Sequence, residues 1–334
     1  MNVGQIFVLL GHHLTELSKN PESDLFWKAK TENQWFTVEN IERALRNWSN
    51  ILISEKISAW LDNYSIPHVS PKRVGITMAG NIPLVGLHDL LCVVASGHIA
   101  VCKPSSSDKV LMTEVIDFIN SKGVLNQIRV VENMKEIDAI IATGSNNTSR
   151  YFEYYFGKYP HIIRKNRSSL AVLEGTETNA ELELLGDDVF SFFGLGCRNV
   201  SKVLVPKGYN FNKLFEAFFK YGQVINHNKY ANNYDYNKAI YLLSKEPFLD
   251  NNFMLLRHDN KQISSPLGVL FYQEYEDEVW LEDFLKIHEE EIQVVIGNNI
   301  PFKRTAGFGE AQKPELMDYA DGVDVLKFLI SLGT

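Results

Sequence analysis

The chain has 334 residues, of which 45% are hydrophobic and 22% are charged, and its net charge at pH 7 is −8. This length is sufficient for two domains with a large core, and the composition is typical of a soluble globular protein. The negative net charge excludes a general surface for nucleic acids or anionic membranes. We therefore expect neither a nucleic acid nor a membrane among its partners.

The N-terminus has no basic start followed by an apolar stretch and a cleavage site, and no apolar run approaches membrane-spanning length. Cys92, Cys102 and Cys197 are the three cysteines, which is too few for a disulfide framework. We therefore expect reduced thiols in a cytoplasmic protein. Cys92 and Cys102 lie in apolar runs, which predicts that both pack in the core.

Residues 1–65 are predicted to form helices, because apolar residues recur in them at helical spacing. One series contains Ile6, Leu9, Leu10, Leu14 and Leu17, and another contains Ile41, Leu45, Trp48 and Leu52. Thr37 is a suitable first residue for the second of these helices. A short connector with two prolines follows at 65–71.

Three short apolar strands then alternate with helices. The first strand ends in Ala-Gly-Asn-Ile-Pro at 79–83 before a helix from about Leu84, the second ends in Val-Cys-Lys-Pro-Ser at 101–105, and the third ends in Thr-Gly-Ser at 143–145. This alternation predicts a parallel sheet with crossover helices. In such sheets ligands bind at the carboxyl ends of the strands, where all three polar motifs lie.

A second set of elements begins near Leu170. The expected elements are a strand at 170–173, a helix at 181–193, a strand at 202–205, helices up to 246, strands near 253–257 and 267–272, a helix near 280–290 and a strand from Val294. The Asn- and Tyr-rich tract at 226–237 either rims a substrate entrance or is a loop and helix start.

Cys197 lies in Phe-Phe-Gly-Leu-Gly-Cys-Arg-Asn at 192–199, just before a predicted buried strand. A thiolate is a strong nucleophile near neutral pH. Gly194 and Gly196 would let a substrate carbonyl approach the backbone closely. A buried structural cysteine is the alternative, and the polar motifs upstream favour the nucleophile.

The motifs at 81–83, 101–105, 143–145 and 194–197 resemble, in this order, those of the aldehyde dehydrogenase superfamily. The short chain and its ending at 307–324 resemble the acyl-CoA reductase branch, which includes the fatty-acyl reductases of bacterial bioluminescence (LuxC-like). The resemblance covers about residues 70–330. It implies an α/β fold with two Rossmann-like, parallel-sheet domains.

The domains expected on this basis are a helical segment at 1–65, a cofactor-binding domain at 66–168, a catalytic domain with Cys197 at 169–305, and a C-terminal segment at 306–334 that returns to the cofactor-domain side. The connector at 65–71 leaves no room for the oligomerising hairpin of larger relatives. The connector therefore argues against a tetramer of the family type, and a homo-oligomer stays open.

The resemblance assigns two catalytic residues. Attack by Cys197 on a carbonyl creates an oxyanion, which needs preorganised hydrogen-bond donors. Asn81 matches the family asparagine that has this role, together with the backbone N–H of Cys197. The alternative for Asn81 is a turn-forming residue before a helix.

The expected cofactor-binding residues are Met78, Lys103, Ser105, Ser106, Gly144 and Ser145. In relatives the lysine reaches the adenosine ribose, and the helix start at Gly144 and Ser145 favours phosphate, although a plain helix cap also explains Ser145. NAD-preferring relatives carry an acidic residue where this chain has Ser106. Hydroxyls can donate to a 2′-phosphate, so we expect NADPH, with NADH as the alternative.

Ordinary aldehyde dehydrogenases activate water with a glutamate, but the corresponding segment here, 161–169, has no carboxylate. Glu174 follows the next strand and is not equated with that base. An acyl-enzyme that is not hydrolysed can accept hydride, which predicts reduction of an acyl-CoA or acyl-carrier-protein thioester to an aldehyde. The alternatives are acyl-phosphate reduction, CoA-acylating aldehyde oxidation, and a non-catalytic nucleotide-binding protein.

The remaining polar residues support no further site. His12, His13 and His161 lack partners at metal-ligand spacing, so no metal is expected. Arg198 either lowers the pKa of the thiol, attracts a phosphate or points elsewhere. The basic run at 164–167 either contacts phosphates or is a solvated connector.

Overall fold

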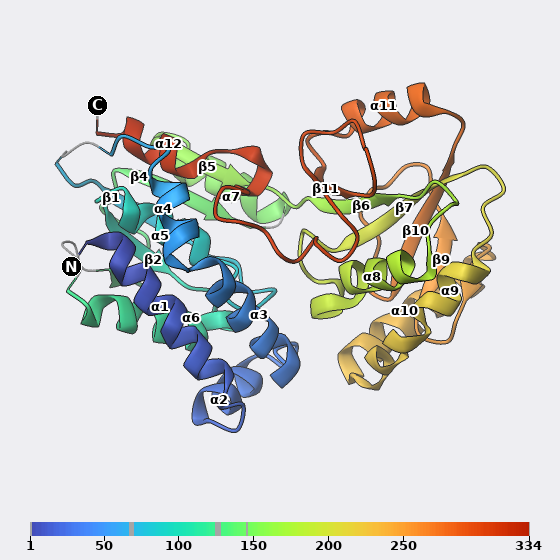
Figure 1. The fold of residues 1–334 in the computed structure, drawn as a ribbon, viewed down its shortest axis with the longest axis horizontal. Coiled ribbons are helices and arrows are strands. Elements are labelled where there is room, and N and C mark those ends of the chain that lie inside the picture. Colours follow the sequence, from blue (N-terminus) through green and yellow to red (C-terminus); the bar gives the residue numbers. More distant parts are fainter. Residues whose placement is uncertain (1, 67–69, 124–127, 145, 334) are drawn as a thin grey trace. The chain divides into compact units, whose positions relative to one another are not determined.

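The computed structural model describes residues 2–66, 70–123, 128–144 and 146–333 (Figure 1). The chain divides into two units, one of residues 1–166 and 315–334 and the other of residues 167–314. Each unit has its own sheet and its own buried core.

The first unit is built on a parallel sheet with the strand order β3-β2-β1-β4-β5. Its strands are β1 (Arg73–Thr77), β2 (Ile99–Lys103), β3 (Arg129–Val130), β4 (Ala139–Thr143) and β5 (His161–Arg164), and its crossover helices are α5 (Leu87–Ala95), α6 (Lys109–Ser121) and α7 (Asn146–Phe156). From β1 the chain adds β2 and β3 on one side, and then β4 and β5 on the other side. The carboxyl ends of β1 and β4 therefore border the crevice in which doubly wound sheets bind ligands.

Four helices precede this sheet and contribute to the same core (Figure 1). They are α1 (Val3–Ser18), α2 (Asp24–Glu32), α3 (Val38–Ile51) and α4 (Ser54–Leu61). The expected helix start at Thr37 is confirmed, because its side chain accepts the N–H of Asn40. Most residues of the predicted apolar series are buried, as Leu10 and Leu45 illustrate, whereas Leu9, Leu17 and Trp48 are only partly buried.

Residues 315–334 also pack in the first unit and end in α12 (Val325–Ser331), which lies against α5. The indole Nε1 of Trp60 donates to the Tyr319 hydroxyl at 2.8 Å. The carbonyl of Leu329 lies 2.9 Å from Nε2 of His98. These contacts fix the C-terminal helix on the core.

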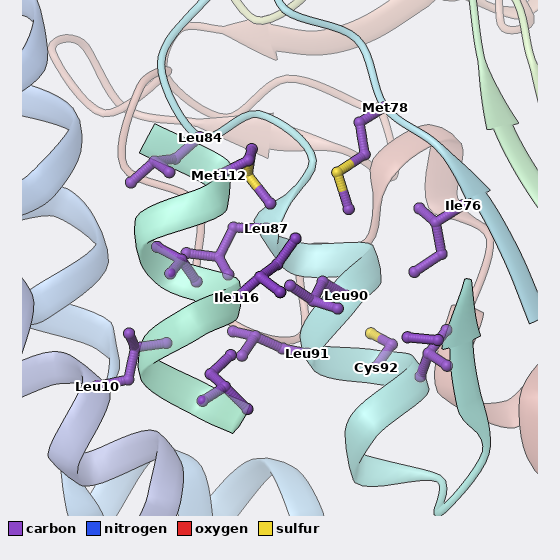
Figure 2. Close-up of a cluster of buried hydrophobic side chains, with 14 of the residues drawn as sticks. Leu10, Ile76, Met78, Leu84, Leu87, Leu90, Leu91, Cys92, Met112 and Ile116 are labelled. Atoms are coloured by element: carbon purple, nitrogen blue, oxygen red, sulfur yellow. The ribbon is translucent and has the colours of Figure 1, made fainter. Parts of the chain in front are cut away.

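The core between β1, α5 and α6 is a cluster of Leu, Ile and Met side chains (Figure 2). Cys92 lies in this cluster, and Cys102 is equally buried, with 0% of each residue exposed. The prediction that both cysteines pack in the core is confirmed.

The second unit has a sheet with the order β12-β11-β6-β7-β10-β9-β8, parallel except for the β8–β9 pair. Its strands are β6 (Ser168–Val172), β7 (Val200–Pro206), β8 (Leu249–Asp250), β9 (Leu255–His258), β10 (Val269–Tyr275), β11 (Ile292–Ile296) and β12 (Thr305–Ala306). Its α-helices are α8 (Asn179–Phe190), α9 (Asn212–Phe218), α10 (Asn228–Ser244) and α11 (Glu278–Ile287). The prediction of an α/β fold with two mainly parallel sheets is confirmed.

Both faces of the second sheet are covered by helices (Figure 1). Ala171 and Val203 join the core beneath α8 and α9, whereas their neighbours Leu170 and Leu204 join the core beneath α11. This double burial explains why the strands are apolar throughout.

Two predicted helices have different limits in the structure. The helix expected from about Leu84 begins at Leu87, since Leu84 is in the left-handed region with φ of 58°. The helix expected at 181–193 spans Asn179–Phe190, because Phe192 and Phe193 are also left-handed. The tract at 226–237 is a helix start, since α10 begins at Asn228.

The sequence predicts domain boundaries at 168/169 and 305/306, whereas the units divide at 166/167 and 314/315. Residues 306–314 stay with the second unit for two reasons. β12 pairs with β11, and the Asp188 side chain accepts hydrogen bonds from the N–H groups of Gly309 and Ala311.

Gly11 marks a close approach of α1 to the end of α3, because a Cβ there would lie 2.4 Å from the Leu52 carbonyl oxygen. Relieving this clash requires a backbone shift, so we expect Gly11→Ala to lower the free energy of unfolding by about 1–3 kcal/mol. Gly4→Ala on the same helix is the control, since its Cβ would meet nothing closer than 3.5 Å. Urea denaturation should show Gly4→Ala to be neutral or slightly stabilising. Equal stabilities of the two variants would contradict the close packing.

Candidate active site

Cys197 lies at the amino end of the second sheet, between the 3₁₀ helix Ser191–Gly194 and β7. It is exposed, which excludes the buried structural cysteine that the sequence left open. The Ser169 hydroxyl, near the start of β6, donates to the Cys197 carbonyl at 3.0 Å. The thiol is thus presented on a short loop anchored to the sheet edge.

Asn199 connects both sides of this loop to α8. Its side-chain carbonyl accepts the Gly196 N–H at 2.8 Å. Its amide donates to the carbonyls of Ser191 at 2.8 Å and Asp188 at 3.0 Å. Only 3% of Asn199 is exposed, so these bonds are made away from competing water.

A second connection runs through residues 309–311. The buried carboxylate of Asp188 accepts the N–H groups of Gly309 at 2.7 Å and Ala311 at 2.9 Å. The carbonyl of Ala311 in turn accepts a hydrogen bond from Nε of Arg198, the residue after the thiol. Asp188 therefore holds the segment on which the Arg198 side chain rests.

Burial raises the pKa of Asp188 to about 7, although its two backbone hydrogen bonds act in the opposite direction. An aspartate in the unfolded chain has a pKa near 4. The folded state therefore binds the proton more tightly, and this group makes the protein less stable as the pH rises from about 4 to about 7.

We therefore expect the stability advantage of the wild type over Asp188→Asn to shrink across this pH range. The difference in their free energies of unfolding should fall by up to about 4 kcal/mol between pH 4 and pH 8. Urea denaturation of both proteins at matched pH values measures it, because other titrating groups cancel in the difference. A difference that does not change with pH would contradict the raised pKa.

A small pocket of about 40 Å³ adjoins the Cys197 loop. Phe193 and Gly194 of the loop, Ser201 of β7 and Tyr230 of α10 contribute to its wall. Tyr230 belongs to the Asn- and Tyr-rich tract, so this tract supplies part of the pocket wall as well as a helix start. The volume accommodates only a few atoms.

In the first unit, Asn81 is exposed on the loop at the carboxyl end of β1. The Asp108 carboxylate holds this loop by accepting the Leu84 N–H at 2.7 Å. Burial raises the pKa of Asp108 well above its ordinary value. Gly80 is required here, since a Cβ would lie 2.6 Å from the Ser105 side chain. The loops after β1 and β2 therefore form one packed edge.

The structure places most of the expected cofactor-binding residues at strand ends of the first sheet. Lys103 is the exposed last residue of β2, and Ser106 is exposed in the 3₁₀ helix Ser106–Asp108. The Ser105 hydroxyl accepts the Ser107 N–H at 3.2 Å. Gly144 follows β4, whereas Ser145 lies outside the described residues. Lysine and hydroxyl donors near a helix start suit a nucleotide phosphate or ribose.

Met78 differs from the other expected cofactor-binding residues because its side chain is buried. Its side chain is 4% exposed and points into the cluster that contains Leu87 and Met112 (Figure 2). Its N–H donates to the Lys103 carbonyl at 3.1 Å. A side chain buried in this way shapes the loop after β1, and the cofactor contact expected of Met78 stays a prediction.

The sequence left two roles open for the basic run at 164–167, a phosphate contact or a solvated connector. Arg164 has neither role. The Arg164 guanidinium is buried and pairs with the Asp89 carboxylate, with Nη2 at 2.8 Å from Oδ1. Lys165 forms an exposed ion pair with Glu153 at 3.3 Å. Arg167 donates to the Glu289 carbonyl at 3.2 Å. All three side chains therefore have partners within their own units.

Glu174 lies past the carboxyl end of β6, whereas the Ser169 hydroxyl bonds the Cys197 carbonyl near the amino end of the same strand. A five-residue strand is roughly 17 Å long. Glu174 and Cys197 therefore lie at opposite ends of β6, which agrees with excluding Glu174 as a base for Cys197.

Among the described residues, no three His, Cys, Asp or Glu side chains gather where they could hold a metal ion. No helix in the described part of the chain is long and apolar enough to cross a membrane.

No family model matches this chain, and no curated protein matches its sequence. Solved structures do match. The NAD-dependent aldehyde dehydrogenase of Sinorhizobium meliloti aligns with a TM-score of 0.66 at 12% identity, over 92% of this chain and 74% of its own. The indole-3-acetaldehyde dehydrogenase of P. syringae, solved with NAD⁺ and IAA, gives 0.67 at 12% identity, over 92% and 76%.

The aldehyde dehydrogenase KauB of Pseudomonas aeruginosa gives a TM-score of 0.65 at 13% identity, over 89% of this chain and 72% of its own. Sequence identity is this low throughout, so the likeness concerns the fold. The chain therefore has the fold of the aldehyde dehydrogenases, with the exposed Cys197 on the loop before β7 of its second sheet.

Proposed function

We propose that the protein is a nicotinamide-dependent oxidoreductase that reduces an acyl thioester, from acyl-CoA or an acyl-carrier protein, to an aldehyde. The observation that carries the proposal is the exposed Cys197 on a hydrogen-bonded loop in an aldehyde dehydrogenase fold. Lys103, Ser105, Ser106 and Gly144, at the strand ends of the first sheet, are the residues expected to hold the cofactor.

The reaction begins when the Cys197 thiolate attacks the thioester carbonyl and forms a carbon–sulfur bond. The Asn81 amide and the Cys197 N–H are the proposed donors to the resulting oxyanion. Collapse expels the substrate thiolate, whose conjugate acid has a pKa near 8.5 and so needs little acid assistance. The product of this half-reaction is an acyl group esterified to Cys197.

Bound NADPH would supply a hydride to the carbonyl carbon of this acyl group. The same two donors then stabilise the second oxyanion, Cys197 leaves as a thiolate, and the aldehyde is released. Segment 161–169 has no carboxylate that could activate water, and Glu174 lies at the other end of β6. Both facts support discharge by hydride over hydrolysis.

Oxidation of NADPH with acyl-CoAs of graded chain length tests this function. We expect substrate-dependent loss of absorbance at 340 nm and formation of one aldehyde per NADPH consumed. Turnover with an acyl phosphate but with no thioester would overturn the choice of substrate. Absence of turnover in either direction, including with aldehyde and CoA, would favour a non-catalytic nucleotide-binding protein.

Cofactor choice is tested at Ser106, which is exposed at the end of β2. Ser106→Asp places a carboxylate where a 2′-phosphate would lie, so we expect the KM for NADPH to rise about tenfold or more with little change for NADH. Ser107→Asp, one residue further along the same turn, is the control. An unchanged NADPH-to-NADH ratio in Ser106→Asp would place the 2′-phosphate elsewhere.

A further inference from the structure

The backbone before Cys197 is held in an unfavourable conformation. Phe192, Phe193 and Gly194 have φ values of 51°, 56° and 79°, so three consecutive residues are left-handed. Residues with a Cβ avoid this region, and such strain persists only where surrounding contacts determine the conformation. The loop therefore depends on specific contacts to keep the thiol in place.

Asn199 supplies these contacts. Its amide binds carbonyls on the α8 side of the strained run, and its side-chain carbonyl binds the N–H of Gly196, directly before the thiol. Its own N–H also donates to the Gly196 carbonyl at 3.0 Å. The buried side chain of Asn199 thus joins the end of α8 to the Gly196 N–H, and its backbone N–H binds the Gly196 carbonyl.

Two further contacts act on the same loop. The Ser169 hydroxyl holds the Cys197 carbonyl. The Asp188 carboxylate holds residues 309–311, whose Ala311 carbonyl accepts Nε of Arg198. Arg198 directly follows Cys197 in the chain, and a cationic residue next to a cysteine favours its thiolate.

We propose that Asn199 is a positioning residue that fixes the reactive conformation of Cys197, with Ser169 and Asp188 as weaker supports. The inference rests on the proposed role of Cys197 as the nucleophile. Asn199 makes no contact with substrate in this account and acts only through the loop. Its loss should therefore change the reactivity of the thiol more than the stability of the fold.

The test is alkylation of the wild type and Asn199→Ala by iodoacetamide from pH 5 to pH 10, with the site and extent of labelling measured by mass spectrometry. Cys92 and Cys102 are buried, so labelling of the folded protein reports on Cys197. The thiol is already exposed, so loosening the loop cannot speed labelling by improving access. We expect the pH midpoint to rise by about one unit and the rate at pH 7 to fall about tenfold.

Asn237→Ala is the matched control. Asn237 is also buried in the second unit, and its amide also donates to two carbonyls, those of Asn233 at 2.9 Å and Leu267 at 3.0 Å. We expect a comparable fall in thermal stability and an unchanged alkylation profile. Ser169→Ala removes only the hydrogen bond to the Cys197 carbonyl and should slow alkylation about two- to threefold. This variant replaces Asn199→Ala in the test if Asn199→Ala does not fold.

Wild-type alkylation kinetics in both Asn199→Ala and Ser169→Ala, or an equal slowing in Asn237→Ala, would overturn the inference. Iodoacetamide requires neither cofactor nor thioester. If the wild type turns over no thioester but Asn199→Ala still slows alkylation, the proposed substrate is refuted and the positioning role of Asn199 is intact.

Discussion

Cys197→Ala is expected to reduce thioester-dependent NADPH oxidation by at least about 10⁴-fold and to leave the Kd for NADPH unchanged. The reason is that the acyl group can be neither removed from its thiol carrier nor presented to hydride without a covalent nucleophile. The proposed cofactor residues lie on the first sheet, so a side chain on the loop before β7 should not affect nucleotide binding. Steady-state assays and a fluorescence titration with NADPH measure the two quantities.

Cys92→Ala is the control for this variant. Cys92 is a fully buried thiol on α5, so its loss should lower the stability by about 1 kcal/mol and leave kcat nearly unchanged. Equal activity of Cys197→Ala and the wild type would exclude an acyl-cysteine. A loss of NADPH binding in Cys197→Ala would instead show that the substitution disturbs the cofactor domain.

Asn81→Ala is expected to lower kcat by about 10²- to 10³-fold, because one of two proposed donors to the oxyanion is removed. The effect should fall on kcat more than on the KM for the thioester, since charge on the carbonyl oxygen develops fully only in the transition state. Asn81→Asp should be at least as slow, because a carboxylate repels the oxyanion. Single-turnover reduction of a pre-mixed acyl-CoA by NADPH measures the step directly.

Asn20→Ala is the matched control, because Asn20 is likewise an exposed asparagine in a turn of the first unit. The turn-forming alternative predicts another pattern for Asn81→Ala, with reduced stability of the loop after β1 and a near-normal rate. An Asn81→Ala protein with wild-type single-turnover kinetics would remove Asn81 from the mechanism.

The elements of the fold could be predicted because their signals are local. Short apolar runs ending in Gly-Asn-Ile-Pro, Lys-Pro-Ser and Thr-Gly-Ser become β1, β2 and β4 of one parallel sheet. The element limits that differ, at Leu84 and at Phe192–Phe193, lie at left-handed residues that are not glycine. Such conformations are set by tertiary contacts, so no propensity indicates them.

The residues that support the candidate site were missed for a similar reason. Asp108 holds the Asn81 loop from 24 residues away, and Asp188 holds Gly309 from 121 residues away. Asn199 was visible only as one polar residue ahead of a buried strand. The one available signal was a pair of aspartates in the apolar helix sequence at 179–190, since a carboxylate on the buried side of a helix requires partners.

Arg164 shows the opposite error, in which a position in a basic run suggested a phosphate contact. Arg164 instead forms a buried ion pair with Asp89, and the side chain of Met78, which follows β1, packs in the core. Position at a strand end indicates where a site lies in a parallel sheet, but burial decides which of the residues there can reach a ligand.

In the proposed reaction, the sulfur of Cys197 becomes acylated and is then discharged by hydride. Intact-protein mass spectrometry after mixing with an acyl-CoA, in the absence of any nicotinamide, tests it most directly. We expect a mass increase of one acyl group on the peptide that contains Cys197, its disappearance on addition of NADPH with release of aldehyde, and no adduct in Cys197→Ala. An unmodified mass under these conditions, or an adduct that NADPH does not discharge, would contradict it.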